Sequence, residues 1–284
     1  MRAIASAAVA LSLAGCATVQ VNRDIPQTGC SHESGWSDQV RAVAAESWLN
    51  AQMAANTYDC EGSVPFRLPQ GVERTECQGN DIAGMAFAVF ERPDATTGGT
   101  IRTLSFRGTE NDNPVTIFQD WIFGNLGGLQ NPRGLDVLER LTASEDVDEV
   151  TGHSLGGGIA TYVSLCVDRL RSRVFNGSPR FTRCNNATNP RDSIVEIGEA
   201  LFVARGPLPE ANQTYTAINC LQSGSAIYQH GMPLLARCLT EIAAYSDPAA
   251  AQSLADNGFP WPKEHDPSIV ALRRARCVPN TAAI

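Results

Sequence analysis

The sequence has very little lysine and little histidine. Lys263 is the only lysine, and no block of Lys and Arg interrupts a chain whose formal net charge is -8. Because nucleic-acid binding depends on basic side chains that neutralise phosphates, this charge distribution argues against a nucleic-acid partner. No Cys-x-x-Cys pair occurs and the chain has only 4 histidines, which argues against a zinc site. We therefore expect neither a metal nor a cofactor.

The N-terminus lacks an apolar run long enough to cross a bilayer. Arg2 precedes a short apolar stretch over residues 4–13, which is typical of an export signal. The following residues, Leu13-Ala14-Gly15-Cys16, resemble the bacterial lipobox. This resemblance implies a signal peptide over residues 1–15 and a lipid anchor on Cys16 that tethers the protein to the cell envelope. The residue after the cysteine is Ala17 rather than an aspartate. In proteobacterial lipoproteins this favours export to the outer membrane, where the protein would face the periplasm or the cell surface. The alternative is an ordinary signal peptide that contains a cysteine.

Of the 9 cysteines, eight follow Cys16. An even number of cysteines in an exported chain indicates disulfides. Spacing does not determine the pairing, but two pairs close short loops and are the first to test: Cys60 with Cys77, and Cys220 with Cys238. We interpret Cys166 as a buried thiol that follows a helix.

The periodicity of apolar residues predicts one α/β domain. A polar tether is expected over residues 16–35 and the domain over residues 36–284, ending in a surface tail. Strand, tight turn, helix and strand in succession is the order found in a parallel sheet. The expected helices are 37–58, 118–123, 134–141, 154–170 and 231–245, and the expected strands are 82–91, 100–106, 147–152 and 172–175.

A glycine-rich pattern lies at the junction of an expected strand and an expected helix. Gly152-His153-Ser154-Leu155-Gly156 matches the G-x-S-x-G nucleophile elbow, in which a sharp turn presents the serine. The amide groups and the positive dipole end of the helix N-terminus would face the serine oxygen and any developing oxyanion. This context predicts that Ser154 is a nucleophile. The alternative is a glycine-rich turn with an incidental serine.

Three further motifs accompany the elbow in a fixed order. Phe106-Arg107-Gly108-Thr109 and Asp120-Trp121 precede it, and Gly177-Ser178-Pro179-Arg180 follows. Over residues 37–245 the chain thus resembles the class 3 lipases, a fungal-lipase-like branch of the α/β-hydrolases, and its bacterial relatives in particular. The resemblance implies an α/β-hydrolase fold with a mainly parallel sheet flanked by helices.

The same resemblance implies two donors of an oxyanion hole, Thr109 and Leu155. Acyl transfer builds negative charge on the carbonyl oxygen, and each donor aimed at that oxygen can be worth on the order of 100-fold in rate. The alternative for Thr109 is a threonine at a strand end.

A nucleophilic serine needs a general base, and the histidines allow elimination. His32 lies in the expected tether, and the elbow normally directs the side chain of His153 away from the path of attack. Because hydrolases of this type have the chain order Ser, acid, His, the choice lies between His230 and His265. His230 is favoured because it opens an expected helix and resembles the His-containing segment of the bacterial relatives, whereas His265 lies in a Pro-rich, charged tail. The alternative for His230 is a helix-capping or partly buried histidine.

The acid that orients the base lies between the nucleophile and His230, and position alone does not choose it. Gly198-Glu199 resembles the glycine-aspartate step of the family, which favours Glu199 although the family residue is usually aspartate. The carboxylates available are Asp168, Asp192, Glu196, Glu199 and Glu210, with Glu196 and Asp192 next in order.

These residues predict a serine hydrolase that cleaves carboxylic esters through an acyl-enzyme on Ser154. The family resemblance and the expected membrane anchor favour lipid esters as substrates, in the manner of a lipase, phospholipase or esterase. Three alternatives stay open. The same triad could transfer the acyl group to an alcohol other than water or cleave a thioester or a polymeric ester. The chain could instead be a non-catalytic envelope lipoprotein that uses the hydrolase scaffold for binding, or a structural anchor stabilised by disulfides, although an anchor has no reason to keep the elbow.

Overall fold

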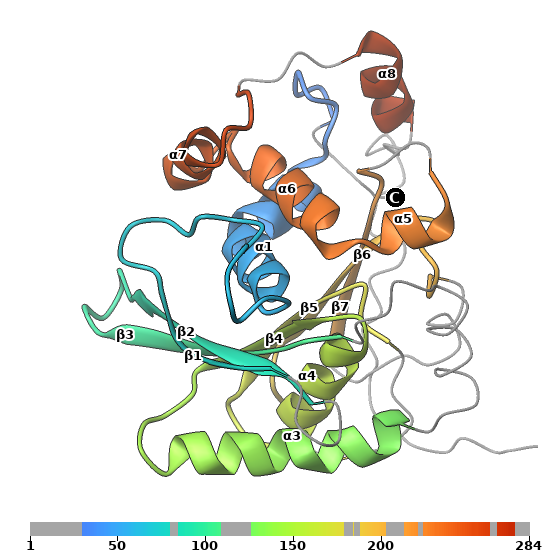
Figure 1. The fold of residues 1–284 in the computed structure, drawn as a ribbon. Helices are drawn as coiled ribbons and strands as arrows, with labels where there is room; N and C mark the ends of the chain where they lie inside the picture. Colours follow the sequence, from blue (N-terminus) through green and yellow to red (C-terminus); the bar gives the residue numbers. More distant parts are fainter. Residues whose placement is uncertain are drawn as a thin grey trace, which may run out of the picture.

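A computed structural model describes residues 30–79, 85–108, 126–178, 184, 188–202, 213–220, 224–261 and 266–275. Its centre is a seven-stranded sheet in the order β1-β2-β3-β4-β5-β6-β7 (Figure 1). Pairing is antiparallel from β1 to β3 and parallel from β3 to β7, so β2 alone runs against the other strands. The strands are β1 (Glu73–Gln78), β2 (Phe87–Pro93), β3 (Thr100–Phe106), β4 (Glu149–His153), β5 (Arg171–Phe175), β6 (Arg191–Glu196) and β7 (Gln213–Ile218).

Helices cover both faces of this sheet (Figure 1). On one face lie α1 and α6 with α7 beyond them, and on the other face lie α3 and α4. The mainly parallel sheet flanked by helices confirms the predicted fold class. The helices of the described residues are α1 (Asp38–Asn56), α3 (Leu126–Thr142), α4 (Leu155–Cys166), α5 (Ala226–His230), α6 (Met232–Ala243), α7 (Pro248–Asp256) and α8 (Pro267–Ala275).

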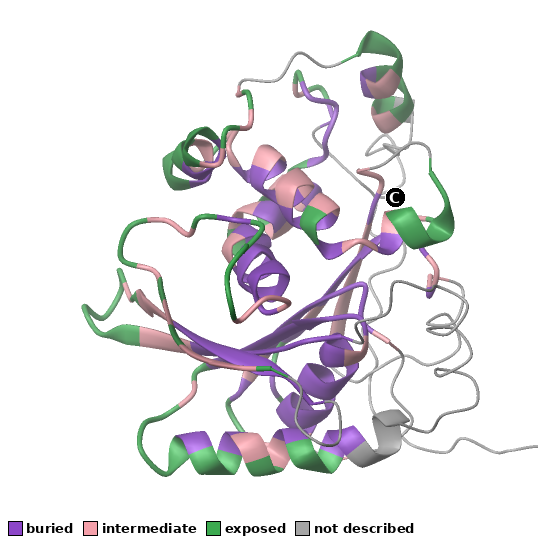
Figure 2. Ribbon diagram, viewed as in Figure 1, coloured by how far each residue is buried: buried purple, intermediate pink, exposed green. Residues whose placement is uncertain are grey.

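Two large hydrophobic clusters and one small one hold the layers together. Between α1 and α6, Trp48 and Ala51 pack with Leu239 in one cluster. On the opposite face, Phe106 of β3 packs with Ile159 of α4 in a second cluster. Every residue of β4 is buried, as expected for the central strand of a parallel sheet covered on both sides (Figure 2).

Several elements differ from the sequence prediction. The helix expected over 134–141 is longer and begins at Leu126, with Pro132 inside it. The helix expected to extend to residue 170 ends at Cys166, because Val167 has an extended backbone. The expected surface tail contains the helices α7 and α8. The strands β1, β6 and β7 were not predicted, and the helix expected over 118–123 lies outside the described residues.

Three disulfides join described residues. The bonds are Cys60–Cys77, Cys166–Cys184 and Cys220–Cys238, and Cys30 is also disulfide-bonded. The two pairs proposed from loop length are confirmed. The interpretation of Cys166 as a free buried thiol is wrong, because the chain that leaves β5 returns Cys184 to the end of α4.

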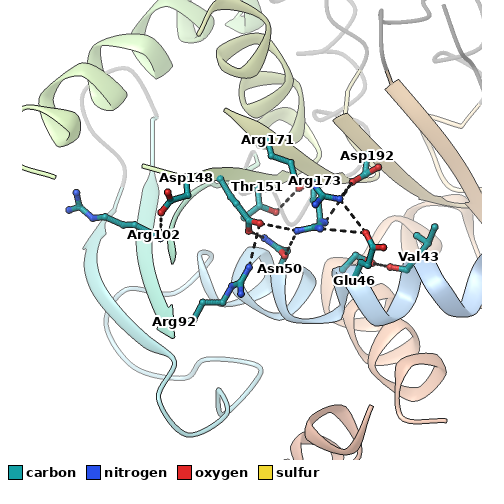
Figure 3. A network of polar contacts seen from close by, with 12 residues as sticks. Val43, Glu46, Asn50, Arg92, Arg102, Asp148, Thr151, Arg171, Arg173 and Asp192 are labelled. Atoms are coloured by element: carbon teal, nitrogen blue, oxygen red, sulfur yellow. Dashed lines mark hydrogen bonds and ion pairs between the residues drawn. The ribbon is translucent and has the colours of Figure 1, made fainter. Parts of the chain in front are cut away.

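A buried charge network lies at the start of β4 (Figure 3). The Glu149 carboxylate accepts hydrogen bonds from Arg173 Nη1 at 3.1 Å and from Asn50 Nδ2 at 3.1 Å. Arg92 Nη2 lies 3.4 Å from the same carboxylate. These contacts connect α1 to the amino ends of the parallel strands.

Among the described residues, no helix is both long and apolar enough to span a membrane.

Candidate active site

Ser154 occupies a sharp turn between β4 and α4. Its backbone φ of 56° and ψ of -125° lie in a region that residues other than glycine rarely adopt. Ser154 N donates to Phe175 O at 3.1 Å, and Ser154 O accepts from Ser178 N at 2.8 Å, so the ends of neighbouring segments hold this conformation. A Cβ at Gly156 would lie 2.1 Å from Phe106 O, which requires glycine there. The predicted nucleophile elbow is therefore formed.

A chain of hydrogen bonds connects Ser154, His230 and Glu199. His230 Nε2 lies 2.9 Å from Ser154 Oγ, and His230 Nδ1 lies 2.5 Å from Glu199 Oε2. All three residues are buried. Ser154 follows β4, Glu199 follows β6, and His230 ends α5 after β7, so the carboxyl end of the parallel sheet brings them together (Figure 1). With Nδ1–H donating to the carboxylate, Nε2 can accept the serine proton.

The turn after β6 fixes the direction of the Glu199 carboxylate. Gly198 has a φ of +87°, and Leu201 N donates to Glu199 Oε2 at 2.9 Å, so this oxygen accepts from both Leu201 and His230. Of the other carboxylates considered from sequence, Glu210 lies outside the described residues, and Glu196 and Asp192 have different partners. Glu196 Oε2 accepts from Cys220 N at 3.0 Å, and Asp192 pairs with Arg171 at 3.1 Å.

The histidines are distributed as follows. The imidazole of His32 hydrogen-bonds Ser34 at 2.8 Å, and His265 lies outside the described residues. His153 contacts Tyr58 Oη at 2.6 Å and the main-chain oxygen of His230 at 2.7 Å. His230 ends α5, whereas the prediction placed it at the start of the following helix, which begins at Met232.

Of the two proposed oxyanion donors, Leu155 and Thr109, the structure describes only Leu155. Leu155 is the first residue of α4, and its N–H is among the amides that a helix leaves without a partner inside the helix. Thr109, Asp120 and Trp121 lie outside the described residues, so Thr109 stays a prediction. Nowhere in the described part of the chain do three His, Cys, Asp or Glu side chains gather so that they could hold a metal ion.

Two contacts near the serine were not predicted. Tyr58 belongs to none of the four motifs, and no local pattern links it to His153, which is 95 residues away. Asn176 Nδ2 donates to His230 O at 3.2 Å. A sequence signal existed for Asn176, because it directly precedes the Gly177-Ser178 motif.

Comparison with known proteins finds one matching family model. Residues 66–183 match a Tle-like phospholipase domain, described as phospholipase-like. The match contains β1 to β5 and the elbow, and it ends before Glu199 and His230. No curated protein matches the chain.

The comparison with solved structures returns several lipases, all at low sequence identity and low TM-score. Lip2 lipase from Yarrowia lipolytica has 14% sequence identity and a TM-score of 0.39, covering 63% of this chain and 79% of its own. A triacylglycerol lipase from Penicillium expansum has 12% identity and a TM-score of 0.38, and the match covers 66% of this chain and 81% of the lipase. Lipase II from Rhizopus niveus has 19% identity and a TM-score of 0.40, and the match covers 65% of this chain and 83% of the lipase.

Proposed function

We propose that this lipase-like α/β-hydrolase cleaves carboxylic esters of lipids through an acyl-enzyme formed on Ser154. The observation that carries the proposal is the buried hydrogen-bond chain from Ser154 Oγ through His230 to Glu199, with distances of 2.9 Å and 2.5 Å. A serine on a strained turn, a histidine within reach of its oxygen and an acid behind that histidine are the parts required for nucleophilic catalysis.

The proposed reaction has two halves. In the first, Ser154 Oγ attacks the ester carbonyl carbon while His230 Nε2 takes the serine proton, and Glu199 stabilises the resulting imidazolium. The carbonyl oxygen becomes an oxyanion that accepts hydrogen bonds from Leu155 N–H and from Thr109. The alcohol then leaves with the proton from His230. In the second half, water attacks the carbonyl carbon of the acyl-enzyme while His230 Nε2 takes a proton from that water. The bond to Ser154 Oγ then breaks, His230 returns the proton to Ser154 Oγ, and the carboxylic acid is released.

Phospholipid is the substrate class we favour among lipid esters. The support is the phospholipase-like description of the family model, whose matched residues include the elbow. Acyl transfer to another alcohol uses the same acyl-enzyme, and analysis of the products separates it from hydrolysis. Fatty acid as the sole acyl product indicates hydrolysis, and a new ester in the presence of an added alcohol indicates transfer.

We propose further that lipid on Cys16 anchors the protein in the bacterial envelope, at the outer membrane. The support is the Leu13-Ala14-Gly15-Cys16 sequence, which lies outside the described residues. Growth with a labelled fatty acid should label the parent and leave Cys16→Ser unlabelled. Label that persists in Cys16→Ser would contradict an anchor at this cysteine.

A fluorophosphonate probe tests the enzyme directly, because it reacts only with an activated serine. The full-length parent should be labelled, Ser154→Ala should show no labelling, and His230→Ala should lose most of it. His32→Ala is the matched control, since the ring of His32 packs edge-on against Tyr245 and hydrogen-bonds Ser34, and it should label like the parent. No labelling of a folded parent would favour the non-catalytic binding protein instead.

A further inference from the structure

The main-chain carbonyl of His230 accepts hydrogen bonds from two buried side chains. His153 Nε2 lies 2.7 Å from His230 O, and Asn176 Nδ2 donates to the same oxygen at 3.2 Å. His230 is the last residue of α5, and the last carbonyls of a helix have no partner within the helix. Two side chains at the ends of β4 and β5 thus hold the end of the helix that carries the proposed base.

Asn176 also connects His230 to the strand that precedes the acid. Its Oδ1 accepts from Glu196 N at 2.8 Å, and its own N donates to Ile194 O at 2.9 Å. Asn176 is fully buried and has a φ of 43°, a conformation that Asn adopts more readily than most residues. One amide therefore joins the end of β6, three residues before Glu199, to the main chain of His230.

Tyr58 fixes the tautomer of His153. A carbonyl oxygen can only accept, so the contact with His230 O requires that His153 Nε2 carries the hydrogen. In the neutral ring Nδ1 is then an acceptor, and Tyr58 Oη, 2.6 Å away, donates to it. The hydroxyl of Tyr58 thus keeps the Nε2–H directed at His230.

From this geometry we infer that Asn176 and His153 are positioning residues for His230, with Tyr58 supporting His153. The inference rests on the proposed function. With the main chain of His230 held from two sides, only the side-chain torsions of its imidazole remain to be set, and Glu199 sets them. A displacement of about 1 Å at a reacting group can lower the rate on the order of 100-fold, so a clamp on the main chain affects the chemistry.

Asn176→Asp tests the clamp with little change in shape. The aspartate keeps an oxygen that can accept from Glu196 N. Its second oxygen replaces the Asn176 Nδ2 donor, so the hydrogen bond to His230 O is lost and two oxygens face each other. Asn189→Asp is the matched control, because Asn189 is also a buried amide whose Nδ2 donates to main-chain oxygens, those of Ser164 at 2.6 Å and of Val167, before the start of β6. Asn176→Asp should lower the limiting rate of fluorophosphonate labelling on the order of 10- to 100-fold. Asn189→Asp should keep the parental limiting rate at a temperature where both variants are folded by circular dichroism.

His153 allows a rescue experiment. His153→Leu removes the donor to His230 O and should lower the limiting labelling rate about 10-fold or more. The probe concentration that gives half the limiting rate should stay unchanged, because the clamp acts on the base rather than on probe binding. His153→Gln carries an amide N–H that can replace Nε2–H and should recover a large part of the rate. Tyr58→Phe, which keeps the ring and removes the hydroxyl, should lower the rate less than His153→Leu.

The outcomes separate this inference from the proposed function. A parent that is not labelled overturns the proposed function and with it the clamp. A labelled parent together with an Asn176→Asp variant that keeps the parental rate overturns the clamp alone. If Asn176→Asp does not fold, the comparison of His153→Leu with His153→Gln decides, and equal rates for these two variants overturn the inference.

Discussion

At the scale of single residues, Gly108 lies where three parts of the site meet. A Cβ built there would be 2.5 Å from Tyr58 Oη, 2.8 Å from His153 O and 2.9 Å from Ser154 Cβ. The segment that leads to Thr109 therefore lies directly on the elbow. Because two of these neighbours are the main-chain oxygen of His153 and the side chain of Ser154, the proposed nucleophile, a methyl group at position 108 forces the loop away from Ser154.

Gly108→Ala should consequently impair both stability and activity. Overpacking of this kind costs about 1–3 kcal/mol in the free energy of unfolding, and urea unfolding measures it. Fluorophosphonate labelling should fall as well. Gly62→Ala is the control, since a Cβ at Gly62 meets nothing within 4 Å, and it should change neither measurement. A Gly108→Ala variant with parental labelling would show that the loop tolerates displacement.

Glu199→Gln tests which carboxylate orients the base. A neutral amide cannot stabilise the imidazolium and can favour the wrong tautomer, and such a change lowers the rate by up to about 10⁴-fold in a Ser-His-Asp enzyme. Labelling should therefore drop by orders of magnitude in Glu199→Gln. Glu196→Gln, which alters a buried carboxylate bonded to Cys220 N, should retain far more labelling. The opposite order would assign the acid to Glu196.

At the scale of elements, a disulfide encloses the helix that carries His230. Cys220 follows β7 and Cys238 lies in α6, so the bond spans α5, and Cys220 N also donates to Glu196 Oε2. Cys60–Cys77 closes a loop of nearly the same size, with a sequence separation of 17 against 18, but does not enclose a residue of the proposed triad. Loop length therefore does not distinguish the two bonds, whereas their position does.

Replacing each pair by serines should separate stability from activity. Both double variants should lose stability by about 3 kcal/mol, because the closed loops are similar in length. Labelling measured under conditions where both are folded should fall in Cys220→Ser/Cys238→Ser and stay near the parental value in Cys60→Ser/Cys77→Ser. Equal labelling in the two variants would mean that the other contacts of α5 suffice to hold His230.

The elements also show how far the sequence determines the fold. The strand Thr100–Phe106 and the strand, elbow and helix around Ser154 follow from apolar patterning and glycine placement, so local signals predicted them. The strand Glu73–Gln78 is polar and lies at the edge of the sheet, where burial does not select an apolar pattern. Pro132 argues against a helix locally, yet α3 continues through it. Motif, family resemblance and chain order select Ser154, His230 and Glu199 as the proposed triad, and the structure places their side chains within hydrogen-bond distance. The contact of Tyr58 with His153 joins segments 95 residues apart and has no local signal.

At the scale of the whole molecule, the two ends of β4 have different roles. Ser154 follows its carboxyl end, while Glu149 at its amino end pairs with Arg173 and Arg92 in the buried charge network. Burial by itself raises the pKa of Glu149, but the guanidinium groups of Arg173 and Arg92, together with Asn50, outweigh it and lower the pKa below the usual value. The network thus stabilises the ionised carboxylate and links α1 to the central strands.

This lowered pKa makes a prediction about stability in acid. The free energy contributed by ionised Glu149 is fully present above the unfolded-state pKa, near 4.5, and is lost as the pH falls through the lower folded-state pKa. Glu149→Gln removes the closest carboxylate partner of buried Arg173, which keeps longer contacts with Glu46 at 3.6 Å and Asp192 at 3.7 Å. The change should therefore cost about 3 kcal/mol or less near neutral pH, at or below the lower end of the range for breaking a buried ion pair. The deficit relative to the parent should shrink as the pH falls below about 4.5, because the parent then loses the same charge.

Urea unfolding as a function of pH measures this difference. Glu145→Gln is the control, because its carboxylate is largely exposed, and it should follow the parental curve within about 0.5 kcal/mol. Adding Arg173→Met to Glu149→Gln should restore part of the stability, since an apolar side chain removes a buried charge that has lost its closest partner. A deficit that stays constant from neutral to acid pH would mean that Glu149 stabilises the fold through its shape and hydrogen bonds, and not through its charge.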